Sequence, residues 1–106
     1  MRKIFVKLSE KVYFMSCELN MSISDLIGES LNHIGLRNYS IGNVVRNSMF
    51  KDCFPKHSTT VSITEENEEL LEYVSNMYYV SKEGFINSAV ELYYTMQINT
   101  KGGENN

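Results

Sequence analysis

The residues of this sequence best suited to chemistry are four basic side chains near its start. They are Arg2, Lys3, Lys7 and Lys11, with Glu10 as the only acidic residue among them. Residues 1–57 carry a balance of +3, from eight Lys or Arg and five Asp or Glu. Residues 58–106 carry −6, from two Lys and eight Glu. This division is typical of a protein with one surface facing a polyanion. On charge alone, an uneven but solvated surface explains it equally well.

The other reactive side chains form no recognisable catalytic or metal-binding set. Cys17 and Cys53 are too few for a disulfide framework, and Cys17 falls in an expected helix, where a buried thiol is favoured. A bridge between them stays open, although cytosolic thiols usually remain reduced. His33 and His57 have no Cys or carboxylate at ligand spacing. With no nucleophile–base pair visible either, we expect no enzyme activity, metal, cofactor or small-molecule substrate.

Both halves of the chain contain the same elements in the same order: one alternating strand, then two amphipathic helices. In the first strand the apolar residues Ile4, Val6 and Leu8 alternate with Lys3, Phe5 and Lys7. In the second, Val61 and Ile63 alternate with Ser58, Thr60 and Ser62. A lone strand leaves its backbone hydrogen-bonding groups unpaired. We therefore expect strands 3–8 and 58–63 to pair antiparallel within one chain, with Phe5 roughly opposite Thr60.

Cap residues mark where the helices begin. Ser9 and Thr64 are the expected N-caps of the first helices, and Ser22 and Ser81 those of the second. The cap-to-cap distances are 13 and 17 positions, a difference of about one helical turn. Each second helix carries an apolar stripe at helical spacing. The matching stripes are Leu26, Ile27, Ser30, Leu31 and Ile34, and Phe85, Ile86, Ala89, Val90 and Tyr93.

The pattern predicts a mostly α fold with a two-stranded antiparallel β-ribbon. The first copy covers residues 1–34 and the second 58–97. A connecting segment, 35–57, contains a short helix, and a tail from 98 to 106 is expected to be mobile because it is almost entirely polar. No apolar run approaches the roughly 18–20 residues that cross a membrane. The N-terminus has no signal-peptide core. We therefore expect a cytoplasmic protein with no membrane partner.

This arrangement resembles the ribbon-helix-helix DNA-binding domain of the MetJ/Arc type over residues 3–34 and 58–94. That family usually forms dimers of identical chains, whereas this chain would be a tandem, intrachain pseudo-dimer. The tandem form is similar to regulators of filamentous viruses of hyperthermophilic archaea. The resemblance implies a sequence-specific regulator of transcription, most simply a repressor, that binds double-stranded DNA. If the chain is viral, it would act in the cytoplasm of the host cell.

The resemblance also implies which residues contact DNA. The base-contacting residues would be Lys3, Phe5, Lys7, Ser58, Thr60 and Ser62. The phosphate-contacting residues would be Arg2, Ser22, Ile23, Ser24, Ser81 and Lys82. Polar strand side chains can reach base edges in the major groove, and amides at a helix start attract phosphate oxygens. Two residues depart from this chemistry: Phe5 can touch only a thymine methyl or a neighbour, and Glu83 brings negative charge toward phosphate.

Two alternatives stay open. Lys3 and Lys7 can also serve as charges that protect a strand edge from aggregation. The fold could instead belong to an antitoxin-like protein-binding module, although such proteins typically append a longer partner-binding segment than this tail.

Because the two strands carry different outward residues, we expect an asymmetric DNA element. We also expect chains to associate with one another on DNA through segment 35–57, for example through Met49 or Phe54.

Overall fold

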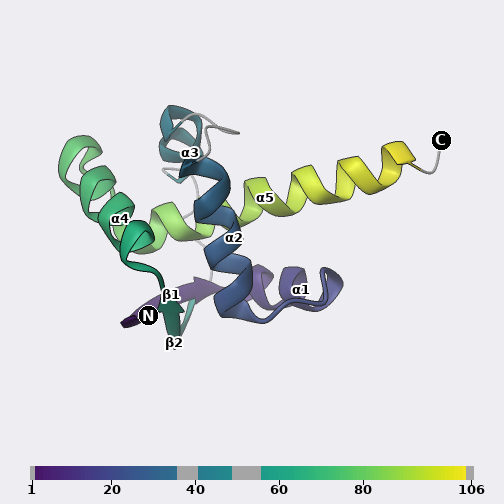
Figure 1. Ribbon diagram of the computed structural model, residues 1–106, viewed down its shortest axis with the longest axis horizontal. Helices are drawn as coiled ribbons and strands as arrows, with labels where there is room; N and C mark the ends of the chain where they lie inside the picture. Colours follow the sequence, from purple (N-terminus) through teal and green to yellow (C-terminus); the bar gives the residue numbers. More distant parts are fainter. Residues whose placement is uncertain (1, 36–40, 49–55, 105–106) are drawn as a thin grey trace.

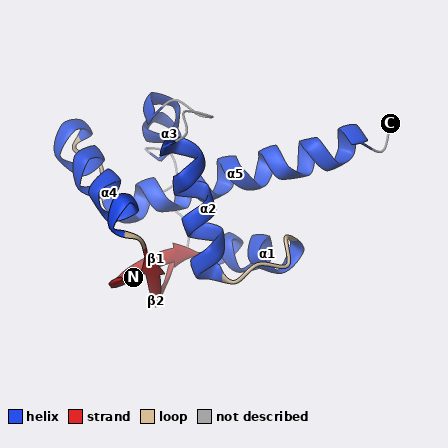
Figure 2. Cartoon of the chain, viewed as in Figure 1, coloured by secondary structure: helices blue, strands red, loops and turns tan. Residues whose placement is uncertain are grey.

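The computed structural model describes residues 2–35, 41–48 and 56–104, and within these ranges it is mostly helical with one two-stranded antiparallel sheet. Figure 2 shows this sheet beneath a set of helices. The elements in chain order are β1 (Arg2–Ser9), α1 (Glu10–Glu18), α2 (Ile23–Gly35), α3 (Ile41–Ser48), β2 (Lys56–Ile63), α4 (Glu65–Tyr78) and α5 (Lys82–Glu104). The coarse fold class expected from the sequence is therefore confirmed.

The two strands pair antiparallel within the chain, in the expected register. Phe5 lies directly opposite Thr60. Val6 and Leu8 of β1 and Val61 and Ile63 of β2 are buried. The period of two thus directs one face of the ribbon into the core and the other outward.

The core lies between the inner face of the ribbon and the helices α2 and α5. All ten members of the two apolar stripes are buried, as predicted. Ser30, the one hydroxyl in the α2 stripe, donates a hydrogen bond to the carbonyl of Leu26 at 2.6 Å, so its burial leaves no polar group unpaired. In Figure 1, α2 crosses α5 above the ribbon, and α3 lies at the opposite end from the strands.

All four expected N-caps accept a hydrogen bond from the first turn of their helix. The bonds run from Lys11 N to Ser9 Oγ at 3.3 Å, Asn67 N to Thr64 Oγ1 at 3.2 Å, Asp25 N to Ser22 Oγ at 3.1 Å and Gly84 N to Ser81 Oγ at 2.9 Å. Each satisfies an amide that has no partner inside the helix. The sequence therefore located the starts of four helices correctly.

The turn between the two helices has the same backbone conformation in both halves. Asn20 has φ 55° and Tyr79 has φ 56°, both in the left-handed region. The two positions are 59 apart, the same spacing as the caps Ser22 and Ser81. Asn tolerates this conformation because its short polar side chain bonds locally, whereas Tyr has no such compensation.

We expect Tyr79→Asn to stabilise the protein by about 0.5–1 kcal/mol by relieving this backbone conformation. Tyr79 is 92% exposed, so few packing contacts are lost. The reverse change in the other half, Asn20→Tyr, should destabilise by a similar amount. Urea unfolding of both variants measures the effect, and a lower midpoint for Tyr79→Asn would contradict this explanation.

Helix α5 continues through residues 98–104, so most of the expected tail is helical, and Figure 1 shows this end projecting from the body. A helix satisfies its own backbone hydrogen bonds and needs no packing partner to continue. Cys17 is exposed rather than buried, because the buried face of α1 passes through Val12, Met15 and Ser16. Cys53, Met49 and Phe54 lie outside the described residues, as does any bridge to Cys53.

Candidate nucleic-acid interface

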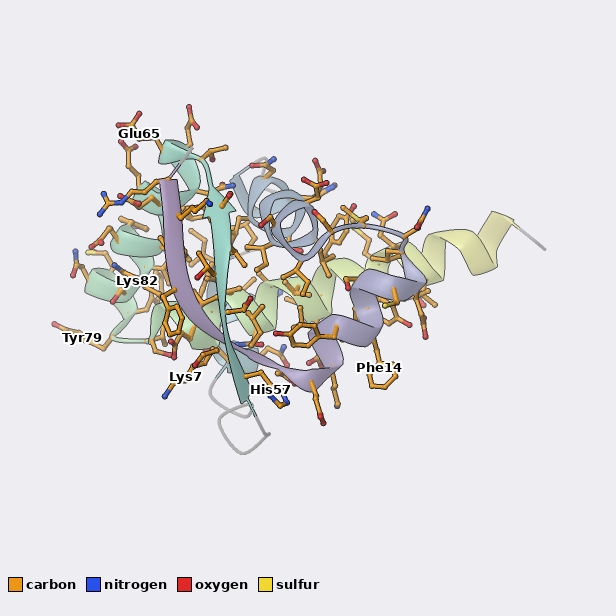
Figure 3. All side chains as sticks on the ribbon, turned by 90° about the horizontal axis from the view of Figure 1, so that it is seen from below. Lys7, Phe14, His57, Glu65, Tyr79 and Lys82 are labelled. Carbon is orange, nitrogen blue, oxygen red and sulfur yellow. The ribbon has the colours of Figure 1, made fainter. Side chains whose placement is uncertain are left out.

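The outward face of the ribbon brings together all six residues expected to contact bases. The cross-strand pairs are Lys3 with Ser62, Phe5 with Thr60 and Lys7 with Ser58. Ser62 is half-buried and the other five are exposed. Figure 3, which views the molecule from the ribbon side, shows both strands in front of the helices and Lys7 extending outward. The two halves of the chain thus contribute equally to one continuous surface.

Two of these six residues are positively charged. Lys3 and Lys7 are four residues apart on β1, or about 13 Å along an extended strand. Neither forms an ion pair with another residue in the described ranges. Phe5 lies between them with 70% of its surface exposed. The face therefore offers two ammonium groups on one strand, an aromatic ring between them and hydroxyl groups on the other strand.

The starts of α2 and α5 lie beside the ribbon, and each is bonded to the strand of the other half. The hydroxyl of Ser24 accepts a hydrogen bond from the backbone N of Ser62 at 3.1 Å. The carboxylate of Glu83 accepts one from the backbone N of Lys7 at 3.2 Å. In the repeat, Ser24 corresponds to Glu83 and Ser62 to Lys7, so the two bonds are equivalent. Ser22 and Ile23 begin α2 at this location, and Ser81 and Lys82 begin α5.

Two of the cations expected to contact phosphate are paired with α4. Arg2 Nη1 lies 3.0 Å from Glu68 Oε1, and Lys82 Nζ forms an ion pair with Glu72. Sequence reasoning missed both pairs. Glu68 and Glu72 are one turn apart, which indicates a shared helix face but not the partner across the fold. Exposed ion pairs typically contribute at most about 1 kcal/mol, so a phosphate group can compete for these cations.

Asn87, which sequence analysis did not single out, fastens the end of β1 to α5. Its Oδ1 accepts from Ser9 N at 2.8 Å, and its Nδ2 donates to the carbonyls of Lys7 at 3.1 Å and Glu83 at 2.8 Å. The residue is 6% exposed. The expected apolar stripe of α5 does not include Asn87, so the sequence pattern gave no signal for it. Position 28, its counterpart in the first half, is Gly, so the repeat gives no hint of this contact.

Within residues 2–35, 41–48 and 56–104, no three His, Cys, Asp or Glu side chains gather where they could hold a metal ion. None of the helices in this part of the chain is both long and apolar enough to cross a lipid bilayer. Comparisons with protein-family models, with curated proteins and with solved structures found no match to this chain. The functional assignment therefore depends on the sequence pattern and on the geometry of the ribbon.

Proposed function

We propose that this chain is a sequence-specific regulator of transcription, most simply a repressor, that inserts its ribbon into the major groove of double-stranded DNA. The observation that carries this proposal is the outward face itself. Six alternating side chains from two distant segments face outward together, and the two lysines among them have no acidic partner in the described ranges. A two-stranded ribbon fits the major groove, which is about 12 Å wide.

Internal symmetry supports a tandem ribbon-helix-helix assignment. The equivalent bonds Ser24–Ser62 and Glu83–Lys7 each join a helix of one half to the strand of the other half. Asn20 and Tyr79 repeat the left-handed turn at matching positions. Two identical chains in a dimer would exchange contacts in this reciprocal way. The chain would thus be a pseudo-dimer in which each half supplies one strand and two helices.

In this proposal the outward side chains and the helix starts contact different parts of the DNA. Lys3 and Lys7 would bind guanine acceptors or nearby phosphates, and Phe5 would contact a thymine methyl group. Ser58, Thr60 and Ser62 would form less discriminating hydrogen bonds. The starts of α2 and α5 would each meet a phosphate on either side of the groove, because helix N-termini attract anions. The negative charge of Glu83 opposes phosphate binding at the start of α5. Ser24, the corresponding residue at the start of α2, is uncharged and does not oppose it.

Selection of duplexes from a random pool tests this function. We expect enrichment of an asymmetric element, with sharper base preference beneath β1 than beneath β2, because the two lysines among the six outward residues, Lys3 and Lys7, both lie on β1. Stoichiometry measured on the selected duplex shows how many chains occupy it. A perfectly palindromic element saturated by one chain would contradict unequal reading by the strands. Failure to enrich any duplex would contradict DNA binding itself.

Glu83→Gln is expected to strengthen binding to the selected duplex by a few fold, about 0.5–1 kcal/mol, since it removes negative charge from a helix start. The amide oxygen of Gln can still accept the bond from Lys7 N. Glu69→Gln removes the same charge from an exposed position on α4 and is the matched control. Equal gains from both variants would show that only net charge matters and that α5 does not approach a phosphate.

An antitoxin-like protein-binding module is the second candidate, and one observation favours it. Tyr73, Met77, Tyr78 and Tyr79, at the end of α4, expose between 39% and 92% of their surfaces. Exposed aromatic and apolar groups gathered on one element commonly mark a protein contact. The same surface could also join chains on DNA, so it does not distinguish the antitoxin-like module from the DNA-binding regulator. The duplex selection experiment distinguishes the two candidates.

A further inference from the structure

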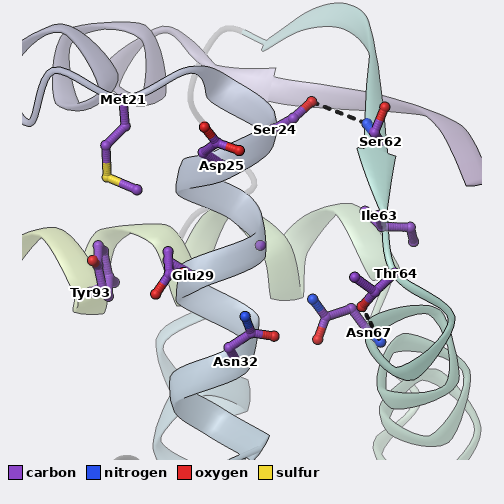
Figure 4. A pocket seen from close by; sticks show the side chains of 11 residues that line it. Met21, Ser24, Asp25, Glu29, Asn32, Ser62, Ile63, Thr64, Asn67 and Tyr93 are labelled. Atoms are coloured by element: carbon purple, nitrogen blue, oxygen red, sulfur yellow. Dashed lines mark hydrogen bonds between the residues drawn. The ribbon is translucent and has the colours of Figure 1, made fainter. Parts of the chain in front are cut away.

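A pocket lies where the first half of the chain has a glycine and the second half has an asparagine side chain. Gly28 of α2 corresponds to Asn87 of α5, and a Cβ placed on Gly28 would meet no atom within 4 Å. The pocket beside it has a volume of about 440 Å³. Figure 4 shows it between α2, the end of β2 and the start of α4, with Tyr93 of α5 on one side.

An unsatisfied amide lines this pocket. Asn67 is only 4% exposed, and its Nδ2 has no hydrogen-bond partner within the described part of the chain. Burying a donor without an acceptor costs about 1–3 kcal/mol, so such groups usually bind water or a ligand. The corresponding residue of the first half is Val12, which is buried in the core. The fold therefore does not require an amide at this position.

The charge of the lining is negative. Asp25 and Glu29 are one turn apart on α2, and no Lys or Arg lines the pocket. Burial raises the pKa of the Tyr93 phenol, and the Glu29 carboxylate raises it further. These groups favour a cation in the pocket and disfavour an anion.

We propose that this pocket binds a small organic cation that also carries a hydrogen-bond acceptor. A rotation of the Asn67 side chain would bring a proton of its buried Nδ2 to this acceptor, and the cationic group would lie near Asp25 and Glu29. At about 30 Å³ for each water-sized group, the volume of about 440 Å³ accommodates roughly fifteen non-hydrogen atoms. Apolar atoms between the two ends would pack against Tyr93 and Met21, which also line the pocket.

The pocket is connected to the ribbon by shared residues. Ser62 lines the pocket and belongs to the outward face, and Ser24 lines it while bonding to Ser62 N. A ligand that alters this contact would change DNA affinity, and DNA would change ligand affinity by the same factor. This regulatory consequence rests on the proposed DNA-binding function, whereas the ligand site does not.

Matched probes and variants test the site without DNA. N-acetyl-lysinamide supplies an ammonium and two carbonyl acceptors, and N-acetyl-norleucinamide differs mainly by lacking the ammonium. Gly28→Asn fills the pocket with the side chain present at position 87, and Asn is no worse than Gly in a helix. Gly42→Asn in α3 is the control, because Gly42 also has open space around its missing Cβ.

The readout is the NMR signal of the Asn67 side-chain amide. We expect N-acetyl-lysinamide to shift it saturably, and the norleucine analogue to bind at least about 5-fold more weakly, about 1 kcal/mol. Binding should disappear in Gly28→Asn and persist in Gly42→Asn. No saturable shift up to about 10 mM, a concentration that detects even millimolar affinity, would mean that the pocket holds water only and would overturn the proposal. Equal binding of both probes, or unchanged binding in Gly28→Asn, would also overturn it.

DNA affinity measured with and without N-acetyl-lysinamide then tests regulation. A change in the parent protein that is absent in Gly28→Asn supports the coupling. Binding of the probe with unchanged DNA affinity overturns the coupling and leaves the ligand site supported. If no duplex binds at all, the proposed DNA-binding function fails, while the NMR result on the ligand site stands by itself.

Discussion

Replacing Lys3 and Lys7 together by Ala is expected to weaken binding to the selected duplex by about 30-fold or more, from at least about 1 kcal/mol for each contact. Both side chains are exposed on the outward face, and within the described ranges neither has an acidic partner that would compensate. If both lysines bind phosphates, the slope of log K against log salt should fall in magnitude by about 0.9 for each lost contact. Fluorescence anisotropy across a salt series measures both quantities.

Arg46→Ala is the control for this double variant. Arg46 is also exposed and basic, but it belongs to α3, at the opposite end of the molecule from the ribbon in Figure 1. We expect its loss to leave the salt slope nearly unchanged. A double variant that binds like the parent, with the same slope, would show that the ribbon face is not the DNA face.

Asn87→Leu is expected to destabilise the protein by about 2–4 kcal/mol, because it leaves Ser9 N and Lys7 O without their partner. Leu has the same number of side-chain heavy atoms as Asn and is somewhat larger, so the loss does not come from an empty space. For a domain of this size the melting temperature should fall by roughly 10–20 °C. Amide exchange should also accelerate at Ser9, whose N–H donates to Asn87.

Asn99→Leu is the matched control, since Asn99 is exposed on the same helix. Substitutions at exposed positions usually change stability by less than about 0.5 kcal/mol. Equal effects of the two variants would contradict the role assigned to Asn87. So would a destabilised Asn87→Leu protein in which the Ser9 amide keeps its protection from exchange.

Two acidic residues of the second half form ion pairs within the fold. Glu68 and Glu72 reach across to Arg2 and Lys82, two of the cations expected to meet phosphate. In the proposed complex, DNA would have to compete with α4 for these groups. Lys3 and Lys7 meet no such competition, and for this reason we assign the larger electrostatic effect to them.

Local patterns predicted the elements, because periodicity and capping act over a few residues. The alternation around Phe5 and Thr60 was sufficient to predict which strand residues face the core, since a slip of one residue would turn Val6 and Val61 outward. Ser9, Ser22, Thr64 and Ser81 marked helix starts through bonds to their own first turns. These interactions depend on sequence neighbours and can be read without the fold.

Interactions between distant residues were not predictable in the same way. Asn87 bonds to Ser9 and Lys7, nearly eighty positions earlier, and no short pattern encodes that contact. The pocket at Gly28 depends on a difference between two halves that otherwise match. The exposure of Cys17 depends on how α1 is rotated against the core, which a helix of nine residues indicates only weakly.

The central claim is that the outward face of the ribbon lies against DNA bases, and photo-crosslinking tests it most directly. Phe5 would be replaced by p-benzoylphenylalanine, with the same replacement at Ile98, exposed on the projecting end of α5, as the control. Each protein would be irradiated with the selected duplex. We predict crosslinks from position 5 to bases within the selected element and none from position 98. Equal crosslinking from both positions, or none from position 5 while the duplex remains bound, would contradict the account.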